Sequence, residues 1–98
     1  MSIVNFTDSA KRDLENITNY SLKNWGKEQT LKYLDNIYDK IFDLSSKPDI
    51  GVLRSDLYSN LLIFPVKKHI IYYIKQVHGI LVVRILHIHM YPKIHEFR

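Results

Sequence analysis

The chain has 98 residues, of which 46% are hydrophobic and 24% are charged, so it predicts one globular domain with a modest core. It has no cysteine, which excludes disulfides and thiolate metal sites and fits a reducing cytoplasm. The N-terminus shows no signal peptide, and no run of about 20 apolar residues could span a membrane. The net charge of +4 is uneven, because residues 67–98 hold six Lys or Arg against one Glu. This imbalance indicates an acidic partner, such as nucleic acid, a nucleic-acid enzyme or an acidic protein segment.

The first half of the chain predicts a short strand and two helices. Residues 2–6 favour a strand, and Thr7 or Asp8 can cap a helix N-terminus through a side-chain oxygen. Apolar and small side chains then recur at helical spacing as far as Gly26, a plausible helix stop. A second stripe predicts another helix over residues 27–45. We therefore expect an antiparallel helical hairpin with a tight joint before Gly26.

The second half predicts three strands. A loop around Pro48 leads to a strand over residues 60–66, which Pro65 should end or confine to a sheet edge. Residues 64–90 then predict a β-hairpin that turns at His78-Gly79. The order β-α-α-β-β-β predicts an α+β fold, in which an N-terminal strand and a two-helix hairpin accompany a three-stranded antiparallel sheet.

The register of the hairpin decides which side chains face the helices. The turn assignment places Tyr73 opposite Arg84 and Ile71 opposite Leu86. The more uniformly apolar face is then the expected core face, with Ile70, Tyr72, Ile74, Leu81, Val83, Ile85 and His87. Because the other face is also rich in apolar residues, we expect a partner to cover it.

Four segments resemble, in their order and spacing, the ParE family of toxins within the RelE/ParE superfamily of bacterial toxin–antitoxin systems. They are TDSAKRDLENITNYSLKNWG, YLDNIYDKIFDLSSKPDIGVLRSDL, FPVKKHIIYYI and GILVVRILHIHM, and the similarity extends from Val4 to about Met90. It implies a single RelE/ParE-like domain over residues 1–98 and a hetero-oligomer with a ParD-like antitoxin. It also implies that the target is DNA gyrase, which the toxin would trap on cleaved DNA by binding to it and not by catalysis. A role in plasmid stabilisation is implied as well.

The resemblance and the basic C-terminal third together suggest contact residues. For the antitoxin we expect contacts at Tyr33, Ile71, Tyr73 and Leu86. For the target we expect contacts in the basic hairpin and tail, at Arg84, His89, Tyr91, Lys93 and Arg98. We expect no catalytic residue, no cofactor and no direct sequence-specific binding of nucleic acid. His87 and His89 share a strand face, but further ligands are not evident, so no metal site is expected.

An alternative is a ribosome-dependent endoribonuclease of the RelE type, in which Arg84, His87 and His95 would be the catalytic residues. The arginine expected after the last strand of such enzymes is missing, and Pro92 begins a turn there. Arg84 also has structural interpretations, as a surface arginine or as the partner of an acidic side chain. A third hypothesis is an inactive family member that only regulates its operon.

Other side chains are interpreted as structural. Core packing is the expectation for Trp25, and Asp13 belongs to a set of acidic residues on a mostly solvated helical face. His69 is expected at the edge of a strand.

Overall fold

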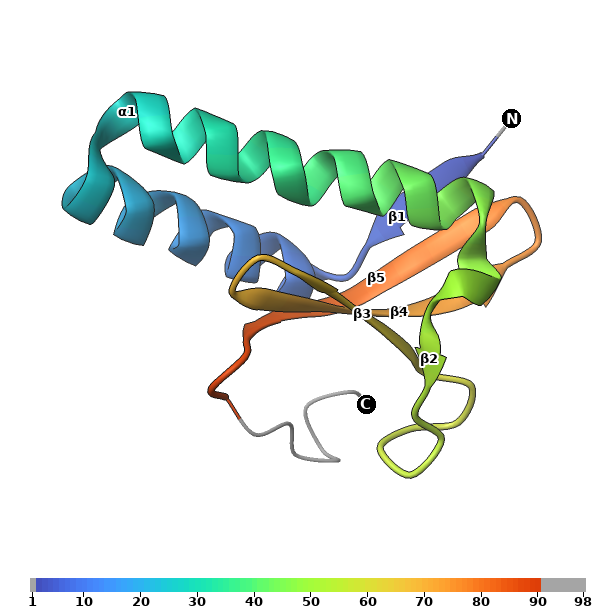
Figure 1. Cartoon of the computed structure of the whole chain (residues 1–98). Coiled ribbons are helices and arrows are strands. Elements are labelled where there is room, and N and C mark those ends of the chain that lie inside the picture. The colour runs from blue at the N-terminus through green and yellow to red at the C-terminus, as the bar shows by residue number, and fades with distance from the viewer. Residues whose placement is uncertain (1, 91–98) are drawn as a thin grey trace.

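The computed structural model describes residues 2–90 and has a helical layer packed on one face of a five-stranded sheet (Figure 1). The strand order is β1-β5-β4-β3-β2, with β1 parallel to β5 and the other pairs antiparallel. The elements are β1 (Ile3–Phe6), α1 (Asp8–Ser46), a 3₁₀ turn (Pro48–Ile50), β2 (Val52–Leu53), β3 (Leu62–Val66), β4 (His69–Gln76) and β5 (Gly79–His87). In this described part, no helix has the length and apolarity needed to cross a bilayer.

The helical layer is one element that is broken at Gly26. Thr7 caps its start, because the side chain accepts a hydrogen bond from the Ala10 N–H at 3.0 Å. At Gly26 the backbone has φ 84° and ψ 173°, a conformation that is essentially restricted to glycine. The chain folds back there, so that the first arm (residues 8–25) and the second arm (residues 27–46) run side by side (Figure 1). The sequence predicted two separate helices; the structure has a single 39-residue element with its break at the predicted joint.

The sheet differs from the predicted three-stranded antiparallel sheet. It is mixed and has five strands, because β1 adds in parallel to β5 and the two-residue β2 adds to β3. β2 pairs only with Leu62 and Ile63, so Pro65 lies beyond that pairing, at an edge where its missing N–H is tolerated. A strand of two residues and a parallel pairing across more than 70 residues leave no local signal in the sequence.

The predicted hairpin register is wrong. The turn consists of Val77 and His78, and Gly79 is already the first residue of β5, paired with Gln76. A Cβ on Gly79 would lie 1.8 Å from the carbonyl oxygen of Ile3, so this glycine allows β1 to approach and is not the turn residue.

A second irregularity completes the register change. Tyr73 faces Val82 while Tyr72 faces Arg84, which leaves Val83 as the extra residue of a β-bulge. Thr7 ties this bulge to the start of α1, because its hydroxyl donates to the Val83 carbonyl oxygen at 2.7 Å.

The core face of the hairpin is not the predicted one, because α1 packs on the side of β4 that holds Ile71 and Tyr73. The sheet face under α1 buries Ile71, Tyr73, Ile80, Val82 and Ile85 with apolar residues of both arms. On the opposite face, side chains of β3, β4 and β5 pack with Leu57 and Leu61 of the β2–β3 loop.

This burial affects three of the four residues expected to contact an antitoxin. Ile71 and Tyr73 are completely buried and Leu86 is 1% exposed. The shift at the turn is by two residues, so Ile71 and Tyr73 stay on one face with Val82 as predicted, but α1 covers that face. The bulge moves Leu86 to the opposite face, where it is buried with Leu61.

Candidate binding groove

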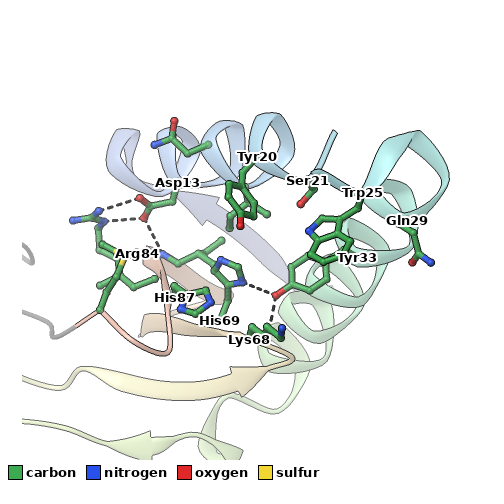
Figure 2. A pocket seen from close by; sticks show the side chains of 15 residues that line it. Asp13, Tyr20, Ser21, Trp25, Gln29, Tyr33, Lys68, His69, Arg84 and His87 are labelled. Carbon is green, nitrogen blue, oxygen red and sulfur yellow. Dashed lines mark hydrogen bonds and ion pairs between the residues drawn. The ribbon is translucent and has the colours of Figure 1, made fainter. Parts of the chain in front are cut away.

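A groove of about 700 Å³ lies between the two arms of α1 and the ends of β4 and β5 (Figure 2). Its volume is in the range of ligand sites in proteins. The first arm contributes Tyr20 and Trp25, the second arm contributes Tyr33, and the sheet contributes His69 and His87. The groove therefore combines aromatic and imidazole rings from elements that are far apart in the sequence.

Asp13 and Arg84 form an ion pair at one end of the groove. Arg84 Nε and Nη2 donate to the two carboxylate oxygens of Asp13 at 2.8 and 2.9 Å. The backbone N–H of Ile85 donates to the same carboxylate at 2.9 Å. Asp13 lies on the buried stripe of the first arm, and the side chains of Asp13 and Arg84 are 10% and 18% exposed. The solvated position predicted for Asp13 is wrong, and the acidic-partner interpretation of Arg84 is confirmed.

Tyr33 and His69 connect the second arm to β4. The Tyr33 hydroxyl and His69 Nδ1 are 2.5 Å apart, and the backbone N–H of Lys68 donates to the Tyr33 oxygen at 3.2 Å. We assign the hydroxyl proton to the bond with His69 Nδ1, which leaves the ring proton on Nε2, while the hydroxyl oxygen accepts the Lys68 N–H. This arrangement suits a neutral imidazole.

The environment of His69 favours the neutral ring. Burial, and to a smaller extent the nearby His87, lower the pKa of His69 to about 4, whereas Asp13 opposes the shift. Burial also raises the pKa of Tyr33, against the opposing effect of the Lys68 N–H. Near neutral pH the pair is therefore uncharged.

Three histidines follow one another along this end of the sheet. The ring centroids of His69 and His87 are 5.3 Å apart and those of His87 and His89 are 5.0 Å apart. The backbone N–H of His89 donates to His87 Nδ1 at 3.2 Å. Within residues 2–90, no three His, Cys, Asp or Glu side chains are arranged to hold a metal ion.

Tyr20 and Trp25 are exposed at the rim of the groove. Tyr20 is 64% exposed and Trp25 is 63% exposed, and in Figure 2 both side chains extend from α1 toward His69. Core packing was predicted for Trp25, but this residue directly precedes the break at Gly26, where the helix extends beyond the sheet. Large exposed aromatic side chains in a groove are typical of binding sites.

The structure brings only some of the predicted site residues together. Tyr33, Arg84, Leu86 and His87 line the groove, and His89 contacts His87. Four predicted residues lie outside the described part of the chain: Tyr91, Lys93, His95 and Arg98. Sequence reasoning assigned no site role to several other residues that line the groove, among them Asp13, Tyr20, Trp25, Lys68 and His69. Only the position of Trp25 beside a helix-breaking glycine could have indicated an exposed ring.

Comparisons with known proteins agree with the fold. A solved structure described as the chromosomal ParDE TA system from P. aeruginosa is similar, with a TM-score of 0.74 and 19% identity, over 89% of this chain and 96% of that chain. The comparison with curated proteins gives no match. The family model described as the ParE toxin of the type II toxin-antitoxin system, parDE, matches residues 4–90. The chain therefore belongs to the ParE toxin family of type II toxin–antitoxin systems.

Proposed function

We propose that this protein inhibits DNA gyrase by binding to it and trapping it on cleaved DNA, and that a ParD-like antitoxin neutralises it. The observation that carries the proposal is the family match over residues 4–90. The similarity of the whole described fold to a chain of a ParDE system supports it.

We place the antitoxin on the outer surface of α1. Leu22 is 45% exposed, Leu31 is 52% exposed and Phe42 is 61% exposed. Leu31 and Phe42 are separated by about three helical turns, so they lie on the same side of the second arm. A two-layer domain normally has polar side chains on such a surface, and an apolar one favours a protein partner.

We place the target contact at the basic end of the sheet. Lys67 and Lys68 directly precede β4, Arg84 lies near the end of β5, and residues 67–90 contain no Asp or Glu. Arg84 and His89 lie in this region, and Tyr91, Lys93 and Arg98 remain predictions for the tail that follows it. A binding role for this region fits inhibition without catalysis, because Arg84 is engaged in an ion pair with Asp13.

The experiment that tests the proposal uses the purified full-length chain, gyrase and supercoiled plasmid. Accumulation of linear DNA covalently bound to gyrase is the expected result, and its loss on addition of the cognate antitoxin is the control. If the folded protein stops bacterial growth without producing such complexes, gyrase is not its target.

The ribonuclease alternative has one supporting observation. Arg84 and His87 line the same groove, next to His69. In this alternative, translating ribosomes with bound mRNA would show new RNA ends when the toxin is added. His87→Ala would abolish those ends while leaving antitoxin binding unchanged, whereas in the gyrase proposal no new RNA ends form.

A further inference from the structure

We propose that the groove binds single-stranded nucleic acid without sequence preference, with bases stacked on Trp25 and Tyr20 and the phosphate chain beside Lys68. This inference goes beyond gyrase inhibition and does not depend on it. The ligand class includes both DNA and RNA, because a stacked base and a phosphate are common to the two.

The aromatic rings provide the first argument. Trp25 and Tyr20 belong to the same arm, line the same groove and each expose more than 60% of their surface. Soluble proteins seldom expose two large aromatic side chains in one groove without a ligand for them. Base stacking suits such rings because every nucleobase presents a flat π surface.

The charges around the groove provide the second argument. Asp13 is the single carboxylate among the described residues that line it, and this carboxylate is paired with Arg84. Lys68 adds a positive charge on the opposite side, in a segment, residues 67–90, that contains no acidic residue. The local field therefore favours an anionic ligand.

The fixed position of the groove wall provides the third argument. The Lys68 backbone is held by the Tyr33 hydroxyl, which also holds His69. At the other end, the two hydrogen bonds from Arg84 to Asp13 and the third from Ile85 fix the bulged strand. A wall held in this way loses little conformational entropy when a ligand binds.

Single-stranded nucleic acid fits these features better than two other anionic ligands. A duplex hides the flat surfaces of its bases within the stack, so it could not use Trp25 and Tyr20 in this way. An acidic peptide could pair with Lys68, but its carboxylate side chains would not stack on the two exposed aromatic rings of the groove.

The chain contains one tryptophan, so Trp25 is a built-in reporter of its own site. The experiment titrates the full-length protein with an eight-nucleotide single-stranded DNA, the same sequence as RNA, the DNA duplex and a poly-glutamate peptide. Saturable quenching of Trp25 fluorescence by both single strands is expected, with much weaker effects from the duplex and the peptide. A difference in affinity between the DNA and RNA titrations shows which of the two nucleic acids the groove prefers.

Variants are compared by the fluorescence anisotropy of a labelled single strand. Trp25→Ala should weaken binding by about 5- to 150-fold, the range measured for loss of one stacked base. Tyr20→Ala should act in the same direction, and Tyr58→Ala, an exposed ring outside the groove, should leave affinity unchanged. Lys68→Gln should reduce the slope of log affinity against log salt by about 0.7, and Lys23→Gln on α1 should not.

Three results would overturn the inference. They are the absence of saturable binding by either single strand, equal binding of the duplex, and equal or tighter binding of the poly-glutamate peptide. The last result would assign the groove to an acidic protein segment. Because the plasmid-cleavage assay with gyrase is a separate measurement, failure of either proposal is recognised independently of the other.

Discussion

Asp13 and Arg84 are 71 positions apart in the sequence and meet in a two-pronged ion pair that joins the first arm of α1 to the bulge of β5. The same carboxylate accepts the Ile85 N–H, so one aspartate satisfies a guanidinium and a strand backbone together. Both side chains are largely removed from water. The start of the helix and the bulged strand are therefore coupled through a single carboxylate.

Removing one member of this pair should be costly. Asp13→Ala removes the buried carboxylate that binds the Arg84 guanidinium and the Ile85 N–H, and we expect it to reduce the free energy of unfolding by about 3 kcal/mol. Urea denaturation monitored by circular dichroism measures the loss. The double variant Asp13→Ala/Arg84→Met should lose less stability than the sum of the two single variants, because it removes both charges of the pair together.

An exposed ion pair on the same sheet provides the control. Lys75 Nζ lies 2.7 Å from Asp49 Oδ1, but the two side chains are 54% and 83% exposed. Asp49→Ala should therefore have a much smaller effect than Asp13→Ala. Equal losses of unfolding free energy in Asp13→Ala and Asp49→Ala would show that burial does not strengthen the ion pair of Asp13.

His69 should make stability depend on pH. Its pKa is lowered from 6.5 in the unfolded chain to about 4 in the folded protein, chiefly by burial. Between these values the unfolded state binds more protons, so the free energy of unfolding should fall as the pH decreases from about 6.5 to about 4. The stability that the folded protein gains by keeping His69 neutral is fully present above about pH 6.5 and is lost below about pH 4.

Unfolding of two variants across this pH range isolates the effect of His69. His69→Gln should flatten the dependence between pH 4 and pH 6.5, whereas His78→Gln, in the exposed β4–β5 turn, should preserve it. If the two variants showed the same slope as the unchanged protein, another group would be responsible for the acid sensitivity.

The fold class and the order of most elements could be predicted because they depend on local patterns. The helical periodicity located both arms, and Gly26 located the break between them. The register could not be predicted, because a glycine after a histidine indicates a turn unless one knows that β1 passes Gly79. That contact joins two segments that are 76 positions apart, from Ile3 to Gly79, and has no local signature.

The candidate site was predicted less well because it also depends on contacts between residues that are far apart in the sequence. Arg84 was recognised as a possible ion-pair member, but its partner could not be chosen among the acidic residues of the helices. Ile71 and Tyr73 are in the core because α1 covers their face of the sheet, and the alternation along β4 does not show which face a distant helix covers. Trp25 appeared apolar and therefore buried, although the position of the break carries it beyond the sheet.

The glycines at positions 26 and 79 should respond differently to substitution by alanine. At Gly79 the new Cβ would collide with the Ile3 backbone, so Gly79→Ala should separate β1 from β5. At Gly26 no atom lies within 4 Å of an added Cβ, and the cost of Gly26→Ala is backbone strain of about 1–3 kcal/mol.

Hydrogen exchange distinguishes the two mechanisms. Gly79→Ala should increase exchange at the Ile3 N–H, which donates to the His78 carbonyl oxygen, and at other amides of the β1–β5 pair. Gly26→Ala should lower global stability while leaving the protection of β1 relative to the rest of the sheet unchanged. Unchanged exchange at Ile3 in Gly79→Ala would contradict the role assigned to this glycine.

The outer surface of α1 provides a test that separates neutralisation from toxicity. Leu31→Ser and Phe42→Ser should each weaken antitoxin binding by about tenfold, since burial of one large apolar side chain contributes about 1.5 kcal/mol or more. Both side chains are more than half exposed, so folding stability should change little. Isothermal titration calorimetry with the cognate antitoxin gives the affinity, and the plasmid-cleavage assay gives the effect on gyrase.

Val77→Ser, at a 91% exposed position in the β4–β5 turn, should leave both measurements unchanged. If Leu31→Ser and Phe42→Ser instead abolished gyrase trapping with unchanged antitoxin affinity, this surface would belong to the target rather than to the antitoxin.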